Sequence, residues 1–408
     1  MCRRCVLLVA LVMLAWASEL PAWGGSATII YVSATASQNG DGSITAPLRT
    51  VEDAIALARS RPIPSVIQIL PGRYSIHGSL TGPDDRIIVD VPNLTIQGSN
   101  QMVFSNDGFP SGVQAKTETL LFADPPLTGN QAIIKVAAAN VTIKNLSLDG
   151  RTSPSELASH SPLLLGGDAA VFVLAQNATV ESNIMTGAFL GLDFSGSGTI
   201  QGNLFTKNMG AGCAVGPAAV PGPPNVNIRG NRSDGNFLAA LALNGNNVNP
   251  GFASLLVVDV DGNDLTGGTA SGFGSGIRIF PIGPGPDPAP LGAVTARIHN
   301  NHIHGNFFSV VVDGGFPFRA SPNSWSGQLD LAFDGNQVAD NANGPLISFT
   351  RFTAFLDPSQ LSAFKYLESS SFTIKYSDDS FDGVVVDDPA VDPISGDVLG
   401  NSLVVQNI

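Results

Sequence analysis

The chain has 408 residues, of which 43% are hydrophobic and 13% are charged. This balance excludes a disordered, solvent-exposed chain, which needs few apolar and many charged residues. The formal net charge of −13 argues against nucleic acid as a partner, because phosphates are bound by Lys and Arg, and it disfavours tight binding of polyanions through charge alone.

The first segment has the pattern of a signal peptide, which we assign to residues 1–22. Arg3 and Arg4 precede an apolar run over residues 6–16, and small residues at 15 and 17 mark a cleavage region at about residues 17–24. A run of eleven residues is too short to span a bilayer, so a membrane anchor is the less favoured alternative. No later stretch is long enough to span. The sequence predicts a secreted or periplasmic protein, with no membrane span after signal removal.

Cysteine usage agrees with a fold that depends on a large core. Cys2 and Cys5 would leave with the signal peptide, so Cys213 is the cysteine expected in the mature chain and no intrachain disulfide can form. Stability must then come from extensive apolar packing. Cys213 lies in an apolar strand pattern, which favours a buried thiol without a chemical role over a nucleophile.

The mature chain is predicted to begin with a strand, a short helix and a second strand. We expect these elements at residues 30–32, 51–58 and 66–69. Thr50 can cap the helix, and Asp53 in the first turn favours its N-terminus. A short amphipathic helix at this place would cover the open end of an apolar core, as a terminal repeat requires.

A degenerate repeat dominates the rest of the chain. Alternating apolar residues run into an Asn, usually preceded by Gly, at Asn145, Asn183, Asn203, Asn231, Asn263, Asn301 and Asn336. The spacing between these positions varies from 20 to 38 residues, which is too irregular for propeller blades or helical repeats. It is typical of a β-solenoid whose loops differ in length from coil to coil.

Each repeat is followed by a second apolar strand. These strands are expected at residues 190–193, 213–215, 241–244, 277–279, 310–313 and 346–349. Stacking would pair every strand with its equivalent one coil away, at about 4.8 Å. The recurrent Asn is then predicted to take the left-handed conformation at the bend between strands and to hydrogen-bond the neighbouring coil, which builds a ladder.

The repeat pattern ends near residue 352. We therefore predict a β-helix over residues 27–352 and a C-terminal cap over residues 353–408, which is too small to hold a core of its own. Asp357 and Pro358 predict the start of a helix over residues 359–367, and residues 403–405 predict a closing edge strand.

Short motifs at the start of the mature chain accompany the repeat. They are Tyr31-Val-Ser, Gly40-Asp-Gly-Ser43, Ala46-Pro47, Thr50, Ala54, Ala58 and Ile69-Leu-Pro-Gly-Arg-Tyr74. With the Asn repeats, which extend the similarity to about residue 350, this pattern resembles the secreted bacterial β-helix repeat proteins of the pectate-lyase-like superfamily. The motifs are structural, so they indicate the superfamily and not an enzyme within it.

Repeat and resemblance together predict an all-β chain. Its architecture would be a single-stranded, right-handed parallel β-helix with a short N-terminal cap helix and a C-terminal cap segment. The superfamily includes enzymes that cleave or epimerise acidic polysaccharides, glycoside hydrolases, phage tailspikes and non-catalytic adhesins. The resemblance thus implies a polysaccharide or cell-surface glycan as partner, while the fold alone does not choose a chemistry.

Elimination of the pectate-lyase type needs acidic ligands for Ca²⁺ or another cation and an Arg or Lys base. Outward positions of the second strands place Asp193, Asn244, Arg278 and Asp313 on one face. Arg278 and Asp313, expected one coil apart, are the candidate catalytic residues, and Asp193 and Asn244 are candidates for substrate binding. Asp193 and Asp313 would lie roughly 19 Å apart, too far to share one ion. No Ca²⁺ ligand cluster is therefore identified, and a surface ion pair is the alternative interpretation.

Two other chemistries of the superfamily find little support. Hydrolysis of the polygalacturonase type needs paired carboxylates and a series of four motifs, of which the segment 276–280 resembles only the last, with Phe280 in place of Lys. The Asp-Pro-His-Asp motif of alginate epimerases is absent from the sequence.

Three histidines lie close together in sequence, namely His299, His302 and His304. On a strand, His302 and His304 would share one face, and two imidazoles with a carboxylate can hold a transition metal. The local pattern offers no third ligand, so no metal site is assigned, and ordinary turn residues of the repeat are the alternative.

The loops after the second strands are expected to build one wall of a groove. In the loop after residue 313, the aromatic rings of Phe316, Phe318 and Trp325 offer faces for sugar stacking, and Arg319 offers a clamp for a carboxylate. The alternative is that these aromatic rings pack the loop itself.

The sequence supports two alternative hypotheses for the function of the protein. The first is an exported β-helix that interacts with polysaccharide and acts as a lyase-like enzyme in the groove. The second is a non-catalytic surface, structural or adhesin-like β-helix. Release of unsaturated uronate from pectate, alginate or chondroitin separates them.

Overall fold

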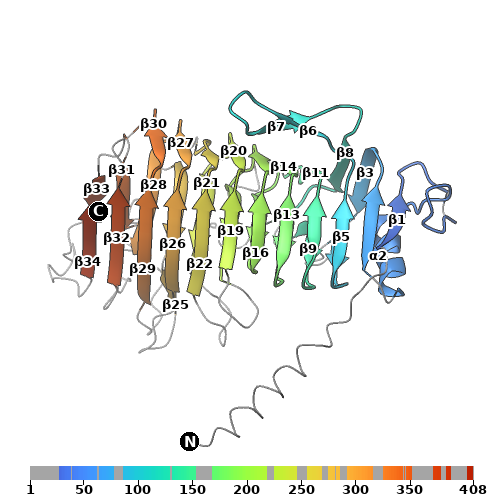
Figure 1. The fold of residues 1–408 in the computed structure, drawn as a ribbon, viewed down its shortest axis with the longest axis horizontal. Coiled ribbons are helices and arrows are strands. Elements are labelled where there is room, and N and C mark those ends of the chain that lie inside the picture. The colour runs from blue at the N-terminus through green and yellow to red at the C-terminus, as the bar shows by residue number, and fades with distance from the viewer. Residues whose placement is uncertain are drawn as a thin grey trace, which may run out of the picture.

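The computed structural model describes residues 27–37, 39–61, 64–77, 86–128, 131–152, 168–217, 225–245, 255–268, 274–280, 282–284, 292–315, 325–342, 344, 346–351, 371–377, 383–386 and 402–407. These residues wind into a stack of coils with three long sheets along its axis (Figure 1). All strand pairs within these sheets are parallel except one, so the right-handed parallel β-helix predicted from the sequence is confirmed. The predicted signal peptide, residues 1–22, lies outside the described residues.

Among the described residues, most coils contribute one strand to each sheet. The first sheet has the order β1 (Thr28–Val32), β2 (Ser65–Ile69), β5 (Leu94–Gln97), β10 (Thr142–Lys144), β13 (Ala178–Glu181), β16 (Gly198–Gln201), β19 (Asn225–Arg229), β22 (Leu255–Asp261), β26 (Gly292–His299), β29 (Trp325–Asp334), β32 (Ser371–Ser377) and β34 (Ser402–Asn407). A short strand, β25 (Ile282–Pro284), pairs antiparallel with β29.

The second sheet has the order β3 (Gly72–His77), β8 (Thr119–Asp124), β11 (Ser147–Asp149), β14 (Ile184–Thr186), β17 (Leu204–Thr206), β20 (Arg232–Asp234), β23 (Asp264–Leu265), β27 (His302–His304) and β30 (Gln337–Ala339). The third sheet runs through β4 (Ile87–Val89), β9 (Ala132–Val136), β12 (Ala169–Val173), β15 (Leu190–Phe194), β18 (Ala211–Val215), β21 (Ala239–Asn244), β24 (Ser275–Phe280), β28 (Phe308–Gly315), β31 (Leu346–Arg351) and β33 (Gly383–Val386).

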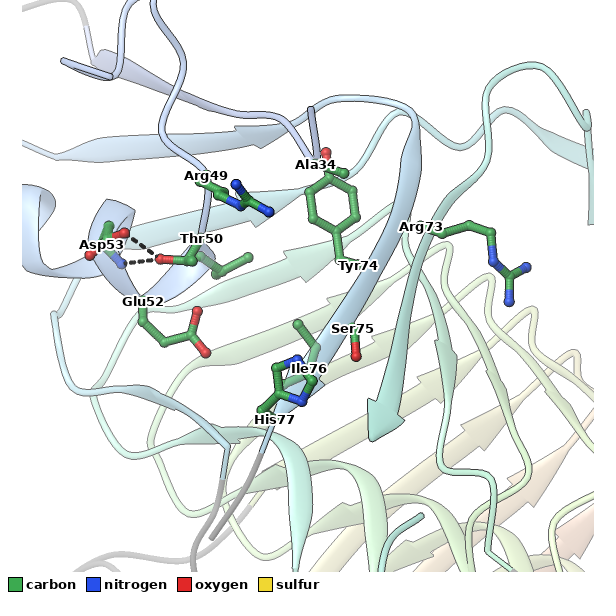
Figure 2. Close-up of a pocket in the computed structure, with 11 residues that line it drawn as sticks. Ala34, Arg49, Thr50, Glu52, Asp53, Arg73, Tyr74, Ser75, Ile76 and His77 are labelled. Atoms are coloured by element: carbon green, nitrogen blue, oxygen red, sulfur yellow. Dashed lines mark hydrogen bonds between the residues drawn. The ribbon is translucent and has the colours of Figure 1, made fainter. Parts of the chain in front are cut away.

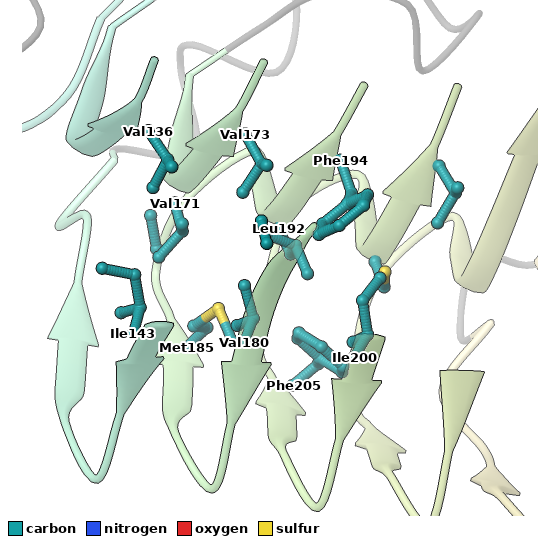
Figure 3. Close-up of a cluster of buried hydrophobic side chains, with 14 of the residues drawn as sticks. Val136, Ile143, Val171, Val173, Val180, Met185, Leu192, Phe194, Ile200 and Phe205 are labelled. Atoms are coloured by element: carbon teal, nitrogen blue, oxygen red, sulfur yellow. The ribbon is translucent and has the colours of Figure 1, made fainter. Parts of the chain in front are cut away.

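Inward residues of the three sheets form one continuous core. Figure 3 shows successive rows of this core, with Val136, Val173 and Phe194 from the third sheet, Ile143, Val180 and Ile200 from the first, and Met185 and Phe205 from the second. Each row follows the strand register, since equivalent residues of neighbouring coils are paired. Burial of each such side chain stabilises the fold by about 1.5–3 kcal/mol.

A ladder of buried asparagines lines the turn from the first sheet to the second. Its members are Asn183, Asn203, Asn231, Asn263, Asn301 and Asn336, all at most 2% exposed. The Nδ2 of each of the first five donates to the Oδ1 of the next, at 2.9–3.1 Å. Each Oδ1 also accepts from a backbone N–H one coil earlier, so the amides replace the hydrogen bonds that the turn itself cannot make.

The predicted ladder is confirmed, but the predicted backbone conformation of its asparagines is wrong. The left-handed residue is the one before the asparagine, at Ser182, Gly202, Gly230, Gly262, Asn300 and Gly335, with φ from 54° to 62°. Asn145 itself takes this position, with φ 56°, and the next residue, Leu146, donates its N–H to Asn183. Asn145 therefore lies at the bend and outside the ladder.

A second group of buried asparagines lies at the turn from the second sheet to the third. Asn208 donates to Asn236 at 2.9 Å, and Asn306 donates to Asn341 at 3.1 Å. In the coil between Asn236 and Asn306, the equivalent position is Gly268, whose backbone N–H donates to Asn306 Oδ1. Two of the three turns of the coil are thus held by buried side-chain amides.

The N-terminal end is covered by helix α2 (Val51–Arg59), as predicted. Thr50 is its N-cap and accepts a hydrogen bond from the N–H of Asp53 at 3.1 Å. Val51, Ala54, Ile55 and Ala58 face the core. In the described part of the chain no helix is long and apolar enough to cross a membrane.

A hairpin inserted between β5 and β8 leaves the stack. Its strands are β6 (Met102–Phe104) and β7 (Pro110–Val113), which pair antiparallel and lie over the second sheet (Figure 1). At the other end, β32, β33 and β34 continue the first and third sheets in parallel. The predicted edge strand at residues 403–405 is part of β34, and the predicted helix at residues 359–367 lies outside the described residues.

Candidate functional site

The predicted site faces outward from the third sheet, where strand register fixes which side chains are neighbours. One row across this face contains Lys135, Phe172, Asp193, Ala214, Ala242, Arg278 and Val311, on successive strands from β9 to β28. Lys135, Phe172 and Asp193 are partly exposed, and the remaining members are buried. Along the axis of the stack, the row is therefore accessible to solvent from β9 to β15 and buried from β18 to β28.

Asp193 is the one carboxyl group among the seven members of this row. Burial raises its pKa to about 6, while a hydrogen bond from Ser195 Oγ to Oδ1, at 3.3 Å, acts in the opposite direction. The unfolded chain would ionise this group at its ordinary, lower pKa, so the folded state prefers the protonated form.

We expect this carboxyl group to make stability depend on pH. A shift to about 6 corresponds to about 3 kcal/mol at full burial, and solvent screening at this partly exposed site reduces it to about 2 kcal/mol. This part of the free energy of unfolding is fully present below the unfolded pKa near 4. It declines as pH rises and is lost above about pH 6. Asp193→Asn mimics the neutral form. Between pH 4 and pH 7, its free energy of unfolding relative to that of the wild type should therefore rise by about 2 kcal/mol, as measured by denaturant unfolding. An equal difference at both pH values would contradict the shift.

Arg278 and Asn244 lie deeper in the same face. Arg278 is 3% exposed and its guanidinium lies 5.4 Å from the ring centre of Phe280. Asn244 pairs with Phe280 and is 4% exposed, and its Oδ1 accepts no hydrogen bond from any described residue. Around them, small and aromatic residues form a second apolar cluster, separate from the core, which includes Ala214, Ala242 and Phe280.

The other predicted site residues are only partly placed. Asp313 lies in β28, two residues after Val311, and it is Val311 that pairs with Arg278. Asp313 pairs with Thr350 of β31, so Arg278 and Asp313 are not direct partners. Its side chain lies outside the described set. Phe316, Phe318 and Arg319 are also outside it, and for Trp325 only the backbone, at the start of β29, is described. The loop wall of the groove therefore stays a prediction.

The second sheet carries a cluster that the sequence revealed only in part. His302 and His304 share the outer face of β27, as expected, and their rings stack with centres 3.9 Å apart. Asp264, on the neighbouring strand β23, is 2% exposed and its Oδ1 lies 2.7 Å from His304 Nε2 and 3.5 Å from His302 Nδ1. Arg232, one strand further, places Nε 3.4 Å from the other carboxylate oxygen.

The electrostatics of this cluster favour a neutral His302. Burial lowers the pKa of His302 below its usual value, and His304 acts in the same direction, while the carboxylates of Asp264 and Asp107 act against it. Asp107 belongs to the hairpin, where it accepts a hydrogen bond from Ser105 Oγ. Ser105 Oγ in turn accepts a hydrogen bond from Arg232 Nη1 at 3.3 Å, so the hairpin approaches the cluster.

A cavity of about 530 Å³ lies at the N-terminal end, between α2 and β3 (Figure 2). Arginine and acidic side chains line it, among them Arg49, Glu52 and Arg73, together with His77. Burial raises the pKa of Glu52. The cavity contains none of the predicted site residues and belongs to the N-terminal cap.

Comparisons with known proteins concern the fold. No family model and no curated protein sequence matched the chain. A solved pectate lyase, Pel9A, is similar at 14% identity and a TM-score of 0.48, over 93% of this chain and 80% of that one. Pectin methylesterase PemA from Erwinia chrysanthemi is similar at 13% identity and a TM-score of 0.44, over 77% and 90% of the two chains. A structure described as a glycoside hydrolase gives 12% identity and a TM-score of 0.42, over 93% and 96%.

Proposed function

We propose that this protein is an exported β-helix that binds an acidic polysaccharide along the outer face of its third sheet. The supporting observation is the accessible part of the outer row, where Lys135, Phe172 and Asp193 occupy equivalent positions of three adjacent coils. Coils repeat at about 4.8 Å, so a polymer of repeating sugars laid along the axis meets successive members of the row. The row supplies a cation, an aromatic face and a carboxyl group.

Each member of the row has a role in such a contact. The Lys135 ammonium lies 5.7 Å from the ring centre of Phe172 and can pair with a uronate carboxylate. The Phe172 ring offers an apolar face to a sugar. Asp193, with its pKa near 6, can donate or accept a hydrogen bond with a sugar hydroxyl. The acidic chain as a whole repels polyanions, so the affinity would depend on this local cation.

Titration with polygalacturonate, alginate and chondroitin, with a neutral glucan for comparison, tests the proposal. Lys135→Gln should weaken binding about tenfold, because the loss of one charged contact costs about 1.5 kcal/mol. Lys144→Gln is the matched control, because Lys144 lies in β10, the next strand along the chain, which belongs to the first sheet. This variant should bind with the same affinity as the wild type. The proposal fails if none of the acidic polymers binds, or if both variants bind like the wild type.

A finer proposal is that the protein cleaves its polysaccharide by elimination, with Arg278 and Asp313 as the reacting groups. In such a reaction a base, here Arg278 in its neutral form, would take a proton from the uronate ring as the bond to the glycosidic oxygen breaks and a carbon–carbon double bond forms. The leaving oxygen would gain a proton, and the unsaturated sugar that remains absorbs in the ultraviolet. The alternative, binding without turnover, is favoured by the burial of Arg278, at 3% exposure. Wild-type protein that binds without releasing this product would establish the alternative.

A further inference from the structure

The cluster of Asp264, His302 and His304 takes no part in the proposed polysaccharide site. It lies on the second sheet, whereas the proposed site lies on the third. Each of the three residues offers one ligand atom, and these atoms all lie within 4.8 Å of one another. An imidazole pair with a carboxylate is a ligand set that zinc and similar ions bind in proteins.

The strand register brings the three ligands together. Asp264 and His302 are direct partners in neighbouring strands, and His304 lies two residues along on the same face as His302. Zn²⁺ lies about 2.0–2.2 Å from nitrogen and oxygen ligands, so two tetrahedral ligands are about 3.4 Å apart. Asp264 Oδ1 and His302 Nδ1 already lie at 3.5 Å. The 2.7 Å contact between Asp264 Oδ1 and His304 Nε2 would open slightly as the ion replaces its proton.

The surroundings hold the carboxylate in place for such an ion. Asp264 is 2% exposed, and Arg232 Nε contacts its Oδ2, which leaves Oδ1 directed to the histidines. A second-shell partner of this kind orients a ligand. The histidines are more accessible, at 41% and 28% side-chain exposure, so an ion can reach them and they can adjust. The positive charge of Arg232 and the two imidazoles both tell against Ca²⁺, which prefers several oxygen ligands.

We propose that Asp264, His302 and His304 bind a divalent transition-metal ion of the zinc class, with one coordination position left for water. Three protein ligands with an open fourth position are typical of zinc sites that keep a reactive or exchangeable water. The ion would join β23 to β27 through their side chains. It would lie beside the β6–β7 hairpin, which reaches Arg232 through Ser105.

Titration of metal-free protein, prepared without a polyhistidine tag, with Zn²⁺ in a calorimeter tests this site. One equivalent should bind at micromolar concentrations or below, and Ca²⁺ should not compete. Co²⁺ should give the intense visible absorption of a four-coordinate ion. Because a ligand that binds only the folded state stabilises it, Zn²⁺ should also raise the thermal unfolding midpoint.

Three conservative variants, His302→Gln, His304→Gln and Asp264→Asn, should each weaken Zn²⁺ binding at least about tenfold and abolish the thermal shift. Both histidines are partly exposed, so their variants should fold, as circular dichroism would verify. His299→Gln is the matched control, because His299 lies between Asp259 and Asp261 outside the cluster. The proposal is overturned if the wild type binds no Zn²⁺, if the histidine variants bind like the wild type, or if only His299→Gln loses binding. None of these outcomes depends on whether polysaccharide binds.

Discussion

Replacing Asn203 with alanine is expected to destabilise the folded protein by about 4 kcal/mol. The side chain is fully buried and makes four hydrogen bonds, two as donor to Val180 O and Asn231 Oδ1 and two as acceptor from Asn183. Alanine leaves several of these groups buried without partners, and each such loss costs about 1–3 kcal/mol. Urea unfolding followed by circular dichroism measures the difference.

Asn177→Gly is the matched control for that experiment. Asn177 also donates its amide to an asparagine one coil away, Asn140, at 3.2 Å, but both side chains are exposed, and glycine keeps the left-handed backbone at φ 53°. Water can replace the lost contact, so a change below about 1 kcal/mol is expected. Equal losses in the two variants would show that burial of the ladder contributes nothing.

The second large effect is expected at the aromatic part of the core. Phe205 in β17 is 1% exposed, and its ring packs closely on Gly191, where an added Cβ would lie 3.1 Å from Cδ1. Truncation to alanine opens a cavity in the core between the three sheets. Hydrogen bonds to the neighbouring coils hold each strand in place, so the sheets cannot close the cavity, and we expect the free energy of unfolding to fall by about 3–5 kcal/mol.

Phe104→Ala provides the comparison for Phe205→Ala. Phe104 lies in the β6–β7 hairpin and is 56% exposed, so its truncation should change stability by less than about 0.5 kcal/mol. The same urea titrations measure both variants. A loss at Phe205 no larger than that at Phe104 would mean that the coils do not share the continuous core shown in Figure 3.

The sequence predicted the coil repeat because asparagines mark the same turn in successive coils of its central part. An asparagine alone does not distinguish the ladder position from the bend before it, since both accept Asn. Asn145 and Asn183 look equivalent in their repeats, yet Asn145 aligns with Ser182 at the left-handed bend. The distinction lies in the spacing, because Asn145 follows the inward Ile143 by two residues whereas Asn183 follows the equivalent Val180 by three. The prediction grouped the repeats by their asparagines and not by this spacing, so it missed the difference that the strand register shows.

The same register explains what was missed at the histidine cluster. The alternation of a strand predicts that His302 and His304 share a face, but Asp264 lies 38 residues earlier in the chain than His302. A signal was present, because Arg232, Asp264 and His302 each directly follow a ladder asparagine. Aligning the repeats on those asparagines would have placed the three residues on neighbouring strands. Loop residues such as Phe316 have no such reference position, so their neighbours cannot be inferred in this way.

The hairpin gives the stack a connection that a simple solenoid lacks. Where coils touch only their immediate neighbours, local opening can spread from one coil to the next without involving the others. The hydrogen bond from Arg232 to Ser105 joins residues 127 positions apart and reaches from the insertion before β8 to β20, four strands away in the second sheet. Opening any coil in that interval strains the connection, so the interval should lose order as one cooperative block, while coils beyond it can fray singly.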